Sequence, residues 1–115
     1  MAEVAFTRGK VGPWDTFTWS GVTEADTFQP VRLEGAIKAA TFQCSGTFGG
    51  ASLVLQGSND ATTWAQMDDV EDVAILHTDA GGSEVRYAWP YYRPNASGGT
   101  SQDIDAILAV MVEPA

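Results

Sequence analysis

The sequence predicts an all-β domain: a β-sandwich, or a small jelly-roll or Greek-key barrel, of short antiparallel strands. Apolar and polar residues alternate in several short runs, and this period of two is typical of half-buried strands. Turn residues, mostly glycine, separate the runs. No stretch shows the apolar spacing of an amphipathic helix of three turns. Many short strands joined by glycine-rich turns are the pattern of a sandwich or barrel.

The chain of 115 residues has the length of one domain. Residues 1–13 are expected to form an N-terminal arm, alone or with one short edge strand, because Gly12-Pro13 interrupts regular structure. Residues 14–115 are expected to form the single β-sandwich domain. A domain of this size buries about two-thirds of the surface that its unfolded chain exposes, which is enough for a hydrophobic core.

The first two predicted strands of the domain lie on either side of a polar turn. In Asp15–Ser20, Phe17 and Trp19 point to one face, and threonine and serine point to the other. The next strand is Phe28–Leu33. Because Pro30 cannot donate a backbone hydrogen bond, this strand belongs at an edge or at a bulge.

The centre of the chain predicts a strand followed by a β-hairpin. Ala36–Ser45 is assigned as a strand although its alanines favour a helix, because its aromatic and β-branched residues and the glycines after it oppose one. The hairpin joins Ala51–Gln56 to Trp64–Met67 through the polar turn Ser58–Thr63. Trp64 is expected to be a buried anchor that fixes the register, since burying such a ring contributes about 2–3 kcal/mol.

The C-terminal part predicts two further strands, Glu84–Trp89 and Ile104–Glu113. The second is apolar on both of its faces, which is typical of a strand covered on both sides. The remaining assignments are a short apolar run at Val73–Leu76, a turn at Thr78–Ser83, an extended aromatic segment at Tyr91–Pro94 and a surface loop at Asn95–Gln102.

Charge narrows the classes of partner. Six Lys and Arg residues against 15 Asp and Glu residues give a net charge of −9, which argues against nucleic acids and anionic membranes. The same charge favours high solubility, or contact with a basic partner surface. The sequence has no run of about 18 apolar residues, so no transmembrane helix is predicted. The N-terminus lacks the layout of a signal peptide, so we expect synthesis in a cytoplasm.

Reactive and metal-binding residues are sparse. Cys44 is the only cysteine and is expected to be a small buried hydrophobe. His77 is the only histidine and is expected near a turn at the surface, away from Cys44. The acidic run at 68–72 offers oxygen ligands for calcium, but its spacing does not match a calcium-binding loop and favours a solvated loop. The sequence therefore predicts no catalytic site, no metal site and no cofactor.

Aromatic residues and arginine, the residue types enriched in interface hot spots, gather in one stretch and in the N-terminal segment. They define a candidate interface. For the aromatic stretch, the equal alternative is that its rings fill or cap the core. The N-terminal segment, with Phe6 and Trp14, is either a loose end or a strap that docks on a neighbour. The candidate interface residues are Phe6, Trp14, Trp89, Tyr91, Tyr92 and Arg93.

The stretch from Phe48 to Trp64, FGGASLVLQGSNDATTW, resembles the GGAxVxLxGSNDGTxW signature of head decoration, or capsid cement, proteins of tailed bacteriophages. The resemblance extends over about the C-terminal two-thirds of the chain, from Thr41 onward. Later segments similar to the family pattern are Arg86-Tyr87, Tyr92-Arg93-Pro94, Ser97–Thr100 and Ile104–Val112.

The resemblance implies a protein that binds the outer surface of an assembled phage head and bridges subunits of the major capsid protein. It also implies a homo-oligomer, a trimer or a dimer at a symmetry axis, that is made in the bacterial host cytoplasm and resides on the virion. The sequence departs from the pattern where Ala61 replaces a glycine, which costs about 1 kcal/mol if that position is left-handed. A second departure is the tract Ala88–Tyr91, which makes the RY…RP spacing longer.

A similar hairpin occurs in discoidin-like carbohydrate-binding sandwiches, so a carbohydrate-binding module on a virion or cell surface is the alternative function. In that case Trp89, Tyr91 or Tyr92 would form the platform on which a sugar stacks. The hairpin alone does not decide between the two, because one local fold can serve different functions.

Overall fold

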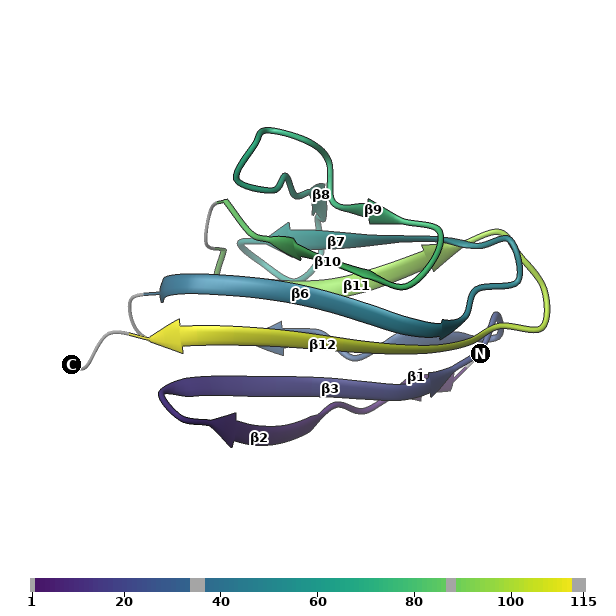
Figure 1. The fold of residues 1–115 in the computed structure, drawn as a ribbon, viewed down its shortest axis with the longest axis horizontal. Helices are drawn as coiled ribbons and strands as arrows, with labels where there is room; N and C mark the ends of the chain where they lie inside the picture. The colour runs from purple at the N-terminus through teal and green to yellow at the C-terminus, as the bar shows by residue number, and fades with distance from the viewer. Residues whose placement is uncertain (1, 34–36, 87–88, 113–115) are drawn as a thin grey trace.

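A computed structural model describes residues 2–33, 37–86 and 89–112, and the structural statements below concern these ranges. They contain strands and loops and no helix, so the predicted all-β sandwich is confirmed. Figure 1 shows two layers of strands that pack face to face. The strands are β1 (Ala2–Val4), β2 (Thr7–Val11), β3 (Trp14–Val22), β4 (Asp26–Phe28), β5 (Val31–Arg32), β6 (Ile37–Thr47), β7 (Ser52–Ser58), β8 (Ala65–Gln66), β9 (Leu76–His77), β10 (Gly81–Glu84), β11 (Tyr91–Ser97) and β12 (Asp103–Val112).

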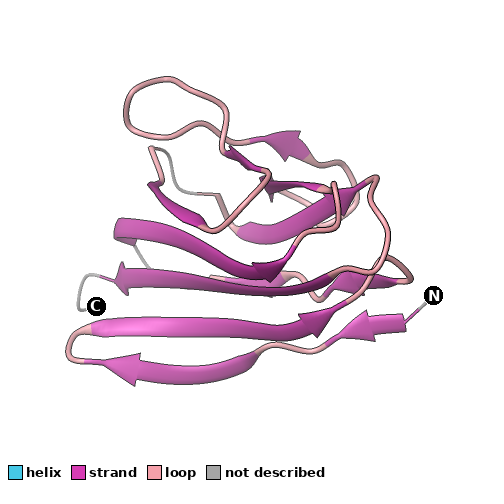
Figure 2. Cartoon of the chain, turned by 45° about the vertical axis from the view of Figure 1, so that its right-hand side comes forward, coloured by secondary structure: helices cyan, strands magenta, loops and turns pink. Residues whose placement is uncertain are grey.

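Each layer is a five-stranded sheet. The β12 sheet has the strand order β10-β6-β12-β3-β2, and the β7 sheet has the order β5-β11-β7-β8, with β9 also paired to β7. All pairs within these two sheets are antiparallel. A third, small sheet is the parallel pair of β1 and β4. Figure 2 shows that the described chain consists of strands joined by loops and turns.

The core lies between the two sheets and follows the alternation of each strand. In β12, every second residue from Ile104 to Val110 is fully buried. Trp19 of β3 and Tyr92 of β11 are the largest fully buried side chains, and burying each contributes about 2–3 kcal/mol. Cys44 is also buried, as predicted.

The N-terminal segment does not form a separate arm over its described residues. β1 pairs with β4, and β2 pairs with β3 along its whole length. Phe6, between β1 and β2, contacts Phe17 and Trp19 edge-on, with ring centroids 5.3 Å and 6.0 Å apart. These contacts supply a reason for the docking, because they pack Phe6 against two buried residues of the core.

The central hairpin forms as predicted, with β7 paired to β8. Asp60 organises its turn: one carboxylate oxygen accepts backbone hydrogen bonds from Thr62 and Thr63, both at 2.9 Å. These bonds lower the pKa of Asp60, because they favour the charged form. The predicted role of Trp64 is wrong, since its side chain is half-buried outside the core and stacks on Arg93.

Two C-terminal predictions are corrected. A strand was expected at Glu84–Trp89 after a turn at Thr78–Ser83, but β10 occupies Gly81–Glu84. It pairs with Thr41–Cys44 of β6, so contacts with a neighbouring strand outweigh the low strand preference of Gly81-Gly82. Part of the expected strand, 87–88, lies outside the described residues. β11 also continues into the predicted loop, as far as Ser97.

Candidate binding surfaces

The outer face of the β12 sheet carries an uncharged patch, which we call the Trp14 face. It consists of the side chains that point away from the core and surround a shallow hollow of about 410 Å³. Ile107 and Ala109 of β12 lie beside Trp14, Thr16 and Thr18 of β3, since β12 and β3 are directly paired. The residues of the Trp14 face are Val11, Trp14, Thr16, Thr18, Gln43, Ile107 and Ala109.

The Trp14 face has the composition of a docking surface. None of its seven residues is charged, although the chain carries a net charge of −9. Ile107 and Trp14 are half-buried, and Val11 is 66% exposed. Interface centres are depleted of charged residues and enriched in aromatic residues, and contiguous exposed apolar patches mark contact sites. The sequence predicts that this strand is covered on both faces. Within this chain the core covers its inner face, whereas Ile107 and Ala109 on its outer face are only half-buried.

The structure does not bring the six predicted interface residues together. Trp14 lies on the outer face of the β12 sheet. Phe6 packs against the core. Tyr92 is fully buried, so its side chain cannot contact a partner. Trp89 packs over Gly57, where an added Cβ would lie 2.4 Å from the ring, and its backbone N–H donates to the Tyr92 hydroxyl at 3.2 Å.

Arg93 belongs to a second exposed cluster, on the outer side of the β7 sheet. Its guanidinium lies 4.3 Å from the centre of the Trp64 ring, and its Nε donates a 2.8 Å hydrogen bond to Gln56. Partial burial lowers the pKa of Arg93. Tyr91 precedes it on the same face of β11 and is also half-buried. Because Arg93 already stacks on Trp64, this ring is less available to an outside ligand than a bare indole.

Cys44 and His77 are the residues from which a reactive site could be built. β10 lies beside β6, so Gly81 pairs with Cys44, and His77 lies next to Gly81. The two residues are thus closer than the sequence predicted. Their partners differ, however: the Cys44 thiol contacts the backbone oxygen of Asp79 at 3.7 Å, and His77 bonds to Ser83 at 3.0 Å.

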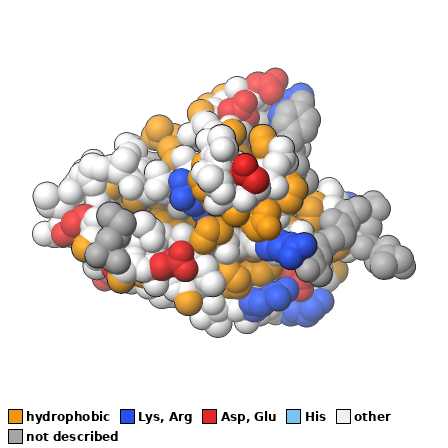
Figure 3. Space-filling view, turned by 180° about the vertical axis from the view of Figure 1, so that it is seen from behind, with side chains coloured by type: hydrophobic (Ala, Val, Ile, Leu, Met, Phe, Trp, Pro, Cys, Tyr) orange, Lys and Arg blue, Asp and Glu red, His pale blue; other side chains and the backbone are white. Residues whose placement is uncertain are grey.

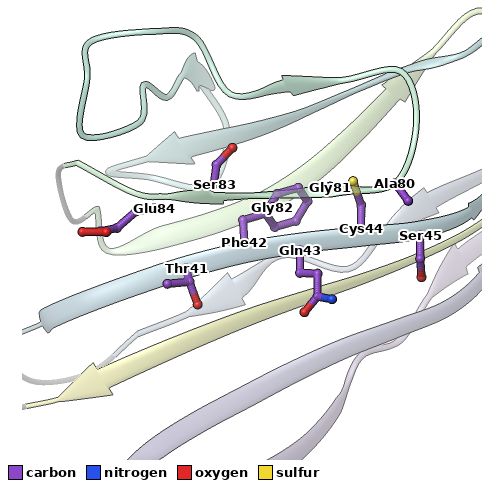
Figure 4. A pocket seen from close by; sticks show the side chains of 10 residues that line it. All are labelled: Thr41, Phe42, Gln43, Cys44, Ser45, Ala80, Gly81, Gly82, Ser83 and Glu84. Carbon is purple, nitrogen blue, oxygen red and sulfur yellow. The ribbon is translucent and has the colours of Figure 1, made fainter.

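Figure 4 shows how the side chains around the hollow beside Cys44 lie. Phe42 and Cys44 point to one side of β6, toward the core, whereas Thr41, Gln43 and Ser45 point to the other. The open hollow lined by these residues and by β10 measures about 610 Å³. Burial raises the pKa of the Cys44 thiol, and this opposes formation of the thiolate on which cysteine chemistry depends.

The acidic loop folds on itself. One carboxylate oxygen of Asp69 accepts hydrogen bonds from the backbone of Glu71 and Val73, and Asp72 forms an ion pair with Arg86 at 3.1 Å. Within the described ranges, no group of three or more His, Cys, Asp and Glu side chains is arranged to hold a metal ion. The same part of the chain contains no helix that could cross a membrane.

Sequence reasoning found part of the Trp14 face and missed the rest. The sequence predicts Trp14 as an interface residue and a second apolar row in the last strand. Val11 was missed because it was assigned to an irregular arm. The signal that could have found the face is a period of two in each of two strands. Side chains on one face are Trp14, Thr16 and Thr18 in the first strand and Ile107 and Ala109 in the second.

Comparisons with known proteins give no family. No family model matches the chain, and no curated protein matches its sequence. Among solved structures, the fold is similar to that of protein NMB1881 from Neisseria meningitidis, with a TM-score of 0.40 and 6% sequence identity. That likeness covers 93% of this chain and 82% of the other, and it is too distant to carry a functional argument.

Proposed function

We propose that the protein is a bacteriophage head decoration protein that attaches to the assembled capsid through the Trp14 face. The observation that carries the proposal is the hairpin Gly57–Trp64 with the strand before it, which resembles the signature of that family. The Trp14 face supports it, because an uncharged patch on an acidic molecule is the surface where contact costs least desolvation and repulsion.

The mechanism is stabilisation by mass action. A ligand that binds the assembled lattice and not its dissociated subunits lowers the free energy of the lattice and so opposes rupture. The net charge of −9 keeps many free copies soluble before they attach. The major capsid protein is the partner, further copies of this chain occupy neighbouring positions, and the virion surface is the final location.

The alternative, a carbohydrate-binding module, receives less support from the described residues. The candidate rings for its stacking platform were Trp89, Tyr91 or Tyr92. Tyr92 is fully buried, and Trp89 lies against Gly57. Only Tyr91 remains as a half-exposed ring, and a single ring on a strand offers a sugar little surface on which to stack.

The proposal is tested by mixing the purified protein with assembled, undecorated heads of the capsid protein encoded nearest to its gene. We expect stoichiometric co-sedimentation and a higher temperature of head rupture. Ile107→Glu places a charge in the Trp14 face and should weaken attachment at least about tenfold, since a buried unpaired carboxylate is costly. Leu76→Glu is the matched control, because Leu76 is 51% exposed and lies on β9 of the other sheet. Heads that stay bare at micromolar protein would contradict the function. Equal attachment of both variants would contradict the assigned face.

A further inference from the structure

One side of the sandwich is open between two edge strands. β2 ends the β12 sheet and β5 ends the β7 sheet, and between them lies a cavity of about 420 Å³. Its walls include apolar side chains from the inner face of the β12 sheet, so the cavity reaches the core. The residues that matter for its chemistry are Phe6, Arg8, Phe17, Arg32, Leu33 and Val110.

The cavity is positively charged although the molecule is acidic. Arg8 lies over the Phe17 ring, 5.2 Å from its centre, and Arg32 of β5 is also among the residues that line the cavity. The one carboxylate among its walls, Asp15, forms an ion pair with Lys10 at 3.5 Å. Within the described ranges, neither Arg8 nor Arg32 forms an ion pair. Figure 3 shows hydrophobic side chains exposed between Lys and Arg side chains on the face seen from behind.

The backbone at this cavity is also available for pairing. Within the described part of the chain, β2 pairs with β3 alone and β5 pairs with β11 alone, so each has one open edge. All five residues of β2 are exposed. An extended peptide can add to such an edge through main-chain hydrogen bonds, while alternate side chains enter pockets beside it.

We propose that this cavity binds an extended segment of a partner polypeptide that pairs with the edge of β2. The segment carries apolar side chains and a carboxylate on the same face: the apolar groups enter the cavity beside Leu33 and Val110, and the carboxylate meets Arg8 and Arg32. Arginine suits this role because its planar guanidinium donates two parallel hydrogen bonds to a carboxylate. The site is separate from the Trp14 face, which lies on the opposite side of the β12 sheet, so it does not depend on attachment to a capsid.

The probe is an N-acetylated, C-amidated heptapeptide of sequence Thr-Val-Thr-Glu-Thr-Val-Thr, which places both valines and the glutamate on one face of a strand. It is titrated into the full-length, isotope-labelled protein, and amide chemical shifts are followed. We expect saturable shifts at β2 and β5. Replacing the glutamate of the peptide by glutamine should weaken binding about tenfold, and lysine should weaken it further.

Protein variants separate the site from general charge effects. Arg8→Gln and Arg32→Gln should each weaken binding about tenfold. Lys38→Gln is the matched control, since it removes one cation that does not line this cavity and should leave affinity unchanged. Retention of the wild-type spectrum away from the cavity verifies that each variant is folded, and the two arginine variants provide independent tests.

Three outcomes of the peptide titration would overturn the proposal: no saturable binding up to about millimolar peptide, a range that spans weak binding; shifts confined to the Trp14 face; or equal affinity for the glutamate and glutamine peptides. In a separate titration, hexanoate replaces the peptide, and the two affinities are compared. If this small acid binds as tightly as the peptide, the cavity is a site for a free fatty carboxylate and the strand-pairing proposal is wrong.

Discussion

At the scale of single residues, Ala61 stands where the decoration-protein pattern has glycine, and this difference should lower the free energy of unfolding. It lies at the corner of the β7–β8 hairpin with φ of 60°, in the left-handed region. A side chain with a Cβ is disfavoured there, whereas glycine is not. The turn is held nevertheless, because Ser58 accepts the backbone N–H of Ala61 at 2.9 Å and Asp60 accepts those of the two residues that follow it.

Ala61→Gly should therefore stabilise the fold. Relief of the left-handed strain outweighs the extra entropy that glycine adds to the unfolded chain, and we expect a gain of about 0.5–1 kcal/mol in the free energy of unfolding. Urea denaturation measures it. Ala65→Gly, on the exposed strand β8, is the matched control and should destabilise by about 0.5–1 kcal/mol, because no positive φ is relieved there. A loss of stability in Ala61→Gly would contradict this account of the turn.

Residue roles were the least predictable part of the sequence. Trp64 and Tyr92 are both large aromatic residues in strand-like runs. Trp64 was expected to be buried and lies outside the core, whereas Tyr92, a candidate interface residue with core capping as the equal alternative, is fully buried. Tyr92 lies opposite Gly57 on the inner face of its sheet, whereas Trp64 precedes β8 and meets Arg93 outside it. The face that a ring occupies depends on its register with a strand far away in the sequence, and a one-residue shift reverses it.

At the scale of elements, strands with their own strong alternation were predictable, and strands that depend on neighbours were not. β3, β6 and β12 were expected within a few residues of their observed bounds. β10 was not, because Gly81-Gly82 carries no local strand signal and is held by pairing with β6. β1 and β2 exceed the single short edge strand expected in the N-terminal segment for a similar reason: their pairing with β4 and β3 gives order to short, mixed runs.

The contact between β7 and the segment before β11 offers a test at this scale. Gly57 lies under the Trp89 ring, and a Cβ there would meet three ring atoms at 2.4–2.8 Å. Gly57→Ala should therefore destabilise the protein by about 1–3 kcal/mol through overpacking. In a Trp89→Leu background, where the indole is absent, the same substitution should cost markedly less. The four proteins form a double-mutant cycle in urea denaturation. Equal costs in both backgrounds would show that Trp89 does not restrict this position.

At the scale of the whole molecule, two properties oppose each other. The net charge of −9 keeps copies apart, while the uncharged Trp14 face offers a surface on which two copies can meet. The net charge can be counted directly from the sequence. The Trp14 face could not be predicted in full, because it forms only when β3 pairs with β12 and brings the two rows of side chains together. The balance between them depends on ionic strength, because charge repulsion is screened by salt and apolar contact is not.

Added salt should therefore promote self-association through the Trp14 face. The screening length falls from about 10 Å at 0.1 M to about 3 Å at 1 M ionic strength, so repulsion between copies weakens while burial of Trp14 and Ile107 remains favourable. Sedimentation velocity at the two salt concentrations should show a larger species at the higher one, with an apparent dissociation constant lowered at least about tenfold, equivalent to about 1.4 kcal/mol. Ile107→Glu should remain monomeric at both concentrations, and Leu76→Glu, which adds the same charge on the other sheet, should behave as the unmodified protein. If both variants associate alike, the contact lies elsewhere, and the uncharged rows of β3 and β12 do not mediate assembly.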